Sequence, residues 1–165
     1  MKKIILVRHG KAEDLSQDLD DFERSLTLRG KKTSRLMAQR LKDKESSVGI
    51  FITSPAFRAL ETALIFAGEF RTNPANILLD NNLYSRMGFG YLTELLQKAK
   101  KETDSIILFG HNPSFTDTAV LLSKDGCGML PKSGVIGISF NIKSWTDLQR
   151  HTGKIEYFLK PEKEL

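Results

Sequence analysis

Two stretches decide the fold: Ile4-Ile5-Leu6-Val7-Arg8-His9-Gly10 and Ile106-Ile107-Leu108-Phe109-Gly110-His111-Asn112-Pro113. Each is a continuous apolar run that ends in a histidine beside a glycine, and such runs are typical of strands covered on both faces of a parallel sheet. A third apolar run, Ile50-Phe51-Ile52-Thr53, continues into Ser54-Pro55-Ala56-Phe57-Arg58. Ligands of open α/β sheets bind beyond the carboxyl ends of the strands. If the three strands are neighbours, their polar ends meet at one place.

Segments with strand and helix patterns alternate along the rest of the chain, and this alternation predicts a three-layer α/β/α sandwich with a mainly parallel central sheet. We expect strands at 3–8, 49–53, 76–79, 105–109, 135–140 and 155–159, and helices at 28–44, 55–70, 90–101 and 113–123.

Local signals support the helices. Thr27 is suited to cap the first helix, Pro55 to occupy the first turn of the second, and Asn112 to cap the last. In the second helix, the spacing of three large apolar residues predicts a core-facing stripe. These residues are Phe57, Leu60 and Leu64.

Composition is that of an ordinary globular domain. The 165 residues are 40% hydrophobic and contain no linker-like tract, so we expect one domain over 1–165. No apolar run approaches the roughly 20 residues of a membrane helix, and Met1-Lys2-Lys3 is followed by too short an apolar run for a secretory signal. We therefore expect no membrane partner. The single cysteine, Cys127, fits a reducing compartment and favours a cytoplasmic location.

The net charge is +5, which raises the question of nucleic-acid binding. The basic residues are dispersed, however, and aromatic residues do not alternate with them as in a stacking surface. We therefore expect no nucleic-acid partner.

The polar residues at the three strand ends are those that phosphoryl transfer requires. A neutral imidazole such as His9 is a competent nucleophile near neutral pH. Arg8 and Arg58 are permanently charged and can make forked contacts to phosphate, and His111 can donate to a phosphoryl oxygen. Asn112 opens a helix whose N-terminus favours anions. We expect the neighbouring Gly10 to allow the backbone to approach a ligand closely.

Other chemistries lack their residues. A zinc site needs three or four ligands, and only His9 and His111 are well placed. The sequence has neither a phosphate-binding Gly-x-x-x-x-Gly-Lys-Ser/Thr loop nor a Gly-x-Ser-x-Gly nucleophile motif. The segments 11–24 and 81–88 are expected to be loops at the rim of the site. His151 is expected at a surface turn and Trp145 in packing.

Four motifs together resemble the histidine phosphatase superfamily, the phosphoglycerate-mutase-like group, and they occur in that family's order. They are Leu6-Val7-Arg8-His9-Gly10, Leu26-Thr27-x-x-Gly30, Ser54-Pro55-x-x-Arg58-Ala59-x-x-Thr62-Ala63 and Gly110-His111-Asn112-Pro113. The short length and the run Arg8-His9-Gly10-Lys11-Ala12 resemble the small bacterial phosphohistidine phosphatases of the SixA type. The resemblance implies a phosphoglycerate-mutase-like fold, His9 as the phosphorylated nucleophile and no metal or organic cofactor. It also implies that Arg8, Arg58 and His111 hold the phosphoryl group.

One position departs from the family pattern. Many members carry a glutamate after the third strand as a general acid, and Asn82 occupies the matching position here. Glu13, Asp14 and Asp80 are the candidates to replace that acid.

The sequence thus favours a metal-independent phosphatase that acts on a phosphohistidine-bearing protein, with a pocket that would also take phosphate or sulfate. Two alternatives stay open. One is a small-molecule phosphomonoesterase acting on a sugar phosphate or nucleotide. The other is a phosphate-binding module without catalysis.

Overall fold

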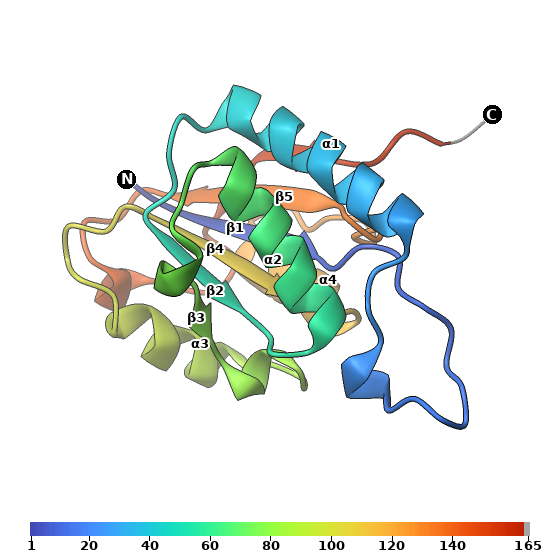
Figure 1. Ribbon diagram of the computed structural model, residues 1–165. Helices are drawn as coiled ribbons and strands as arrows, with labels where there is room; N and C mark the ends of the chain where they lie inside the picture. Colours follow the sequence, from blue (N-terminus) through green and yellow to red (C-terminus); the bar gives the residue numbers. More distant parts are fainter. Residues whose placement is uncertain (164–165) are drawn as a thin grey trace.

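The computed structural model describes residues 1–163 and contains one six-stranded sheet flanked by helices (Figure 1). The strand order is β3-β2-β4-β1-β5-β6. The pairs β3–β2, β2–β4 and β4–β1 are parallel, whereas β5 and β6 are antiparallel additions at one side. The predicted mixed α/β fold with a mainly parallel sheet is confirmed, and the three strands that end in the polar motifs are adjacent as expected.

The strands match the predicted segments within a few residues. The apolar runs predicted the strand positions because they are long enough to span the sheet and are bounded by polar or glycine residues. Their bounds are β1 Lys2–Arg8, β2 Ile50–Thr53, β3 Leu78–Leu79, β4 Ser105–Gly110, β5 Val135–Phe140 and β6 Lys154–Leu159.

Helices cover both faces of the sheet, which gives two separate apolar layers. Residues of α1 (Leu28–Lys44) and α2 (Phe57–Glu69) pack on one face, together with alternate residues of β1 and β4. Residues of α3 (Phe89–Gln97) and α4 (Ser114–Leu122) pack on the other face. Figure 1 shows α1 and α2 lying across one side of the strands and α3 across the opposite side.

The predicted apolar stripe of α2 is wrong. Phe57 is 42% exposed and Leu64 is 40% exposed, while Leu60 is only partly buried. Phe57 instead contacts Phe22 of the short 3₁₀ turn Asp21–Glu23, which precedes α1, with ring centroids 6.0 Å apart. The buried face consists mainly of small residues, because the helix packs closely between the sheet and α1. It contains Arg58, Ala59, Thr62, Ala63, Phe66 and Ala67.

Helix ends differ in detail from the predictions. Thr27 caps α1 as expected, since its hydroxyl accepts the Gly30 N–H at 3.0 Å. Pro55 lies two residues before α2 begins, rather than in its first turn. The capping position of α4 is Pro113, but the Asn112 side chain still accepts the Thr116 N–H at 3.2 Å. The predicted helix over 90–101 ends earlier, at Gln97.

His151 and Trp145 lie in the kinds of position that the sequence predicts for them. His151 is exposed, with a φ of 57°, and Trp145 is 3% exposed. Their predicted surface and packing positions are confirmed. Within residues 1–163, no helix has the length and apolar character needed to cross a bilayer. Residues 164 and 165 of the expected domain lie outside the described part of the chain.

Candidate active site

The carboxyl ends of β1, β2 and β4 bring the two histidines together. The N–H of His9 donates to the carbonyl of Gly110 at 3.0 Å, which joins the residue after β1 to the last residue of β4. The N–H of Ser54 donates to the carbonyl of Phe109 at 2.9 Å and joins β2 to the same strand. The rings of His9 and His111 consequently lie 5.1 Å apart between centroids.

The tautomer of His9 is set by its own backbone. Its Nδ1 lies 2.7 Å from the carbonyl oxygen of Gly10. A carbonyl can only accept, so Nδ1 carries the proton and Nε2 keeps its lone pair. Burial lowers the pKa of His9 to about 3, helped by the positive charges of Arg58 and Arg8. The ring is therefore neutral near pH 7, with a basic nitrogen available for attack on phosphorus.

His111 is also neutral and is oriented by Ser54. The Nε2 atom of His111 lies 2.8 Å from the Ser54 hydroxyl. Burial, and then the charge of Arg58, lower the pKa of His111 to about 4. Its Nδ1 is buried and has no hydrogen-bond partner within the described residues. If the Ser54 hydroxyl donates to Nε2, Nδ1 carries a proton that a phosphoryl oxygen can accept.

Two arginines supply the positive charge. Arg58, at the start of α2, is 5% exposed, and Arg8 is partly buried at the end of β1. A guanidinium N–H of Arg8 donates to the carbonyl of Leu130 at 3.1 Å, which fixes its direction. The Nε atoms of both arginines are buried without a partner in the described chain. Buried donors of this kind are normally paired, so both arginines are suited to hold an anion.

Asp21 is the contributor that the sequence analysis missed. Its carboxylate accepts from Arg58 at 3.1 Å and from the Tyr84 hydroxyl at 2.6 Å, and its backbone carbonyl accepts from Arg58 at 2.7 Å. Arg24 pairs with the same carboxylate at 2.8 Å. Asp21 thereby fixes Arg58 from a loop 37 residues earlier in the chain. The Tyr84 hydrogen bond, followed by Arg58 and Arg24, lowers the pKa of Asp21 to about 2.

Both predicted rim loops contribute to this cluster. The segment 11–24 contains a short 3₁₀ turn at Asp21–Glu23, which carries Asp21 over the strand ends. From the segment 81–88, Tyr84 places its ring edge against His111, with centroids 5.4 Å apart. The sequence predicts both loops at the rim of the site. No motif, however, distinguishes Asp21 from the acidic residues around it.

The three candidate acids lie in different places. Asp14 lines the cavity at the strand ends. Glu13 is exposed, and its backbone carbonyl accepts from Arg24. Asp80 uses its carboxylate to accept from the Tyr91 hydroxyl and from the Asn82 N–H, the latter at 2.9 Å. Asn82 itself is exposed beside that pair.

Gly10 has a different reason to be glycine from the one expected. A Cβ on Gly10 would lie 2.6 Å from the Ser34 hydroxyl and 3.1 Å from the Gly30 carbonyl. The space is needed for packing against α1 rather than for a ligand. The Gly10 N–H donates to the Thr62 hydroxyl of α2 at 3.1 Å. The loop that follows His9 is therefore anchored to two helices at once.

Asn112 lines the cavity, but its amide is engaged in local structure. Its Nδ2 donates to the carbonyl of Leu130 at 2.9 Å, and its Oδ1 accepts from Thr116. Since Arg8 donates to the same Leu130 carbonyl, Asn112 helps to hold the segment that positions Arg8.

These residues surround an open cavity of about 540 Å³. This volume lies within the range of pockets that hold a small organic molecule. No group of three or more histidine, cysteine, aspartate or glutamate side chains within residues 1–163 is arranged to hold a metal ion. The cavity wall contains Arg8, His9, Lys11, Ala12, Asp14, Asp21, Arg24, Arg58, Tyr84, His111, Asn112 and Lys132.

Comparison with known proteins identifies the family. The sequence profile of the histidine phosphatase superfamily (branch 1) matches residues 4–112, which include both histidines and both arginines. The chain belongs to the histidine phosphatase superfamily. This membership supports a phosphatase activity. An uncharacterized protein of Picosynechococcus sp. is 28% identical over 168 residues, covering 99% of this chain and 98% of the relative.

Solved structures share the fold of this histidine phosphatase at low sequence identity. The protein histidine phosphatase SixA complexed with tungstate is 24% identical, with a TM-score of 0.78 over 96% of this chain and 97% of that one. A protein assigned as phosphohistidine phosphatase SixA from Agrobacterium tumefaciens is 22% identical, with a TM-score of 0.78 over 97% and 98%. A phosphoserine phosphatase from Entamoeba histolytica, in complex with 3-phosphoglyceric acid, is 17% identical, with a TM-score of 0.66 over 98% of each chain.

Proposed function

We propose that this histidine phosphatase hydrolyses phosphohistidine on a protein through a phosphorylated His9 intermediate. The observation that carries the proposal is the state of His9. Its Nδ1–H is held by the Gly10 carbonyl, its pKa is lowered to about 3, and its ring stands 5.1 Å from that of His111 beside two arginines. This is a neutral nucleophile fixed in a cationic pocket, as a covalent phosphoryl transfer requires.

The reaction has two displacements. In the first, His9 Nε2 forms a bond to phosphorus as the bond between phosphorus and the substrate imidazole breaks. The substrate ring, protonated on its other nitrogen, leaves as neutral imidazole. In the second, water attacks phosphorus, the bond to Nε2 breaks, and inorganic phosphate and a proton are released. Arg8, Arg58 and the Nδ1–H of His111 stabilise charge on the phosphoryl oxygens in both steps.

Asp21 and Asp80 are unsuited to protonate an alkoxide leaving group, which favours a P–N substrate over an alkyl phosphate; Asp14, which also lines the cavity, is the candidate acid that their contacts leave open. Asp21 approaches Arg58 most closely, but its pKa of about 2 keeps it ionised near pH 7 and unable to donate a proton. Asp80 is engaged with Tyr91. An alkoxide leaving group needs a general acid, which typically contributes about 10²–10⁴-fold. An imidazole that leaves neutral needs no such donor.

The test compares kcat/KM for a phosphohistidine peptide with that for a sugar phosphate and traps the intermediate by rapid acid-free quenching and mass spectrometry. We expect a clear preference for the peptide and a mass increase of one phosphoryl group on His9. The matched control is His9→Asn, whose amide can still donate to the Gly10 carbonyl but cannot attack phosphorus. Equal or reversed values for the two substrates would exclude the proposed specificity.

A second candidate is a small-molecule phosphomonoesterase. It is favoured by the size of the cavity and by the similarity of fold to the Entamoeba phosphoserine phosphatase, whose complex holds 3-phosphoglyceric acid. Preferential hydrolysis of a metabolite in the same assay would select this candidate. A phosphate-binding module without catalysis would bind phosphate but form no phosphorylated His9. Metal independence and a cytoplasmic location are also part of our proposal, the latter favoured by the single free Cys127.

A further inference from the structure

A basic groove leaves the catalytic cavity and continues along α1. A hollow of about 170 Å³ adjoins the cavity, because Lys11 and Lys132 line both. A larger hollow of about 650 Å³ follows it, and Arg29 and Pro161 line both hollows. We call these two hollows the α1 groove. It is a continuous depression between α1 and the chain after β6, and it opens onto the residues around His9.

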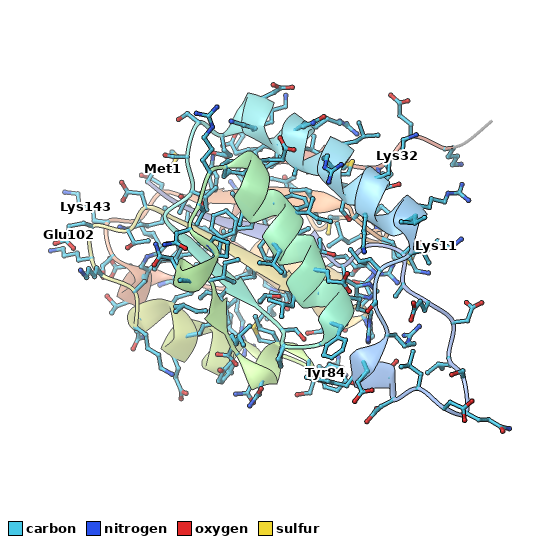
Figure 2. All side chains as sticks on the ribbon, in the orientation of Figure 1. Met1, Lys11, Lys32, Tyr84, Glu102 and Lys143 are labelled. Atoms are coloured by element: carbon cyan, nitrogen blue, oxygen red, sulfur yellow. The ribbon has the colours of Figure 1, made fainter. Side chains whose placement is uncertain are left out.

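The walls of the α1 groove carry mostly positive charge. The cations Lys11, Arg29, Lys32, Lys132 and Lys163 are all exposed. Figure 2 shows Lys11 and Lys32 on the same side of the molecule. Among residues 1–163, the carboxylates in the lining are fewer and consist of Asp43 and Glu162. Leu36, 52% exposed, adds an apolar contact surface. The groove therefore has the charge and shape to receive an acidic, partly apolar polypeptide.

We propose that the α1 groove binds an acidic segment of the phosphoprotein substrate, next to the phosphohistidine that enters the cavity. This inference rests on the proposed function. The catalytic cavity is large enough for a small phosphorylated molecule, so a metabolite would leave the α1 groove unused. A protein surface that presents phosphohistidine to His9 must also lie over the rim, and Lys11 and Lys132 join that rim to the groove.

The expected effect is mainly on association. Complementary charges around a site raise the rate of productive encounter by 10–10³-fold and lose this effect as salt screens them. An acidic phosphohistidine peptide should therefore have a higher kcat/KM than a neutral one, while a substrate that fills only the cavity gains nothing. No aromatic residue is among those lining the α1 groove in the described chain, so it lacks the stacking surface that single-stranded nucleic acid uses.

The experiment uses two synthetic phosphohistidine peptides of equal length, with either Asp and Glu or Asn and Gln flanking the phosphohistidine. Phosphoramidate serves as the small P–N substrate. The enzymes are the wild type, the double variant Lys32→Glu/Lys163→Glu in the groove, and the control Lys100→Glu/Lys143→Glu. Lys100 and Lys143 are exposed, and Figure 2 shows Lys143 on the side of the molecule opposite Lys32. Both double variants change the net charge equally.

We expect the wild type to prefer the acidic peptide by roughly tenfold at low salt and to lose this preference at about 0.5 M salt. The groove variant should lose the preference, the control should keep it, and all three enzymes should hydrolyse phosphoramidate equally well. Equal phosphoramidate turnover also shows that the variants are folded.

Three outcomes would overturn the inference. If the wild type hydrolyses both peptides equally well, the groove has no such role, although the proposed function stands. If the control loses as much preference as the groove variant, the effect belongs to the overall charge. If an oligonucleotide inhibits through Lys32 and Lys163 and no peptide preference exists, the groove binds nucleic acid. Failure to hydrolyse either peptide would instead reject the proposed function itself.

Discussion

The buried histidines predict an unusually steep loss of stability in mild acid. His9 and His111 are each 8% exposed, and their pKa values are lowered to about 3 and about 4. An unfolded histidine has a pKa near 6.5. Below that pH the unfolded chain binds protons that the folded chain does not, so the equilibrium shifts toward unfolding as the pH falls. Above pH 6.5 both states are neutral at these positions and the effect vanishes.

The size of the effect follows from the width of the pKa gap. At pH 5 the pH lies about 1.5 units below the pKa of each unfolded histidine. Protonation there stabilises the unfolded state by about 2 kcal/mol per histidine, because the folded rings stay largely neutral. The two sites together should lower the free energy of unfolding by about 4 kcal/mol between pH 7.5 and pH 5, a large part of a typical total of 5–15 kcal/mol. With a urea m-value of about 2 kcal/mol/M, the midpoint should fall by about 2 M.

Urea unfolding of the wild type and the double variant His9→Asn/His111→Gln isolates this contribution. Asn at position 9 can keep the donor to the Gly10 carbonyl, and Gln at position 111 can keep a contact to Ser54. The variant should lose most of the extra pH dependence between pH 7.5 and 5. His151→Asn, at an exposed turn, is the matched control. The lowered pKa of Asp21, about 2, acts mainly below pH 4 and does not enter this window.

Equal pH dependence in the wild type and the double variant would refute the reasoning, because it would mean that the two rings protonate in the folded state as easily as in the unfolded chain. Saturating phosphate provides a second check. A bound anion between the rings raises both pKa values, so phosphate should stabilise the wild type more at pH 5 than at pH 7.5.

Four further outcomes follow from the site and its packing. His9→Ala should abolish turnover, while Arg58→Ala should reduce kcat by about 10²–10³-fold, as for removal of one transition-state contact, in a steady-state assay. Asp21→Asn should lower kcat/KM by roughly 10–100-fold through misplacement of Arg58, and a variant with wild-type kcat/KM would remove Asp21 from this positioning role. Chelators should leave activity unchanged; loss of activity restored by added metal would contradict this. Gly30→Ala places a Cβ 2.2 Å from the Lys11 carbonyl and should destabilise by about 1–3 kcal/mol in urea unfolding, whereas Gly68→Ala, with open space around it, should not.

The sheet and the histidine pair were predictable because their signals are local and continuous. The runs Ile4–Val7 and Ile106–Phe109 are apolar at every position, which only strands covered on both faces require. Polar residues that follow such strands are then placed at one edge by the topology alone. This is why His9 and His111 could be brought together from sequence.

The helix faces and the rim were less predictable, for different physical reasons. In α2 the buried face includes Ala59, Ala63 and Ala67, because close packing selects small residues. The large apolar side chains of Phe57 and Leu64, which predicted a different face, are exposed. What distinguishes Asp21 is its tertiary contacts to Arg58 and Tyr84, which lie 37 and 63 positions later in the chain. Its loop contains several other carboxylates with the same local chemistry, so only the folded chain distinguishes it.

The stability and the reactivity of the site have one origin. Desolvation that lowers the pKa of His9 keeps its Nε2 lone pair free for attack, and the same desolvation destabilises the fold in mild acid. The two effects therefore cannot be separated by substitutions at His9. A replacement of His9 that removes the acid sensitivity also removes the nucleophile. A substitution elsewhere that exposes the His9 ring to water would return its pKa toward the ordinary value and weaken its hydrogen bond to the Gly10 carbonyl. Near pH 7 the lone pair is available and the cost in stability is almost absent, so the arrangement is best suited to a neutral environment.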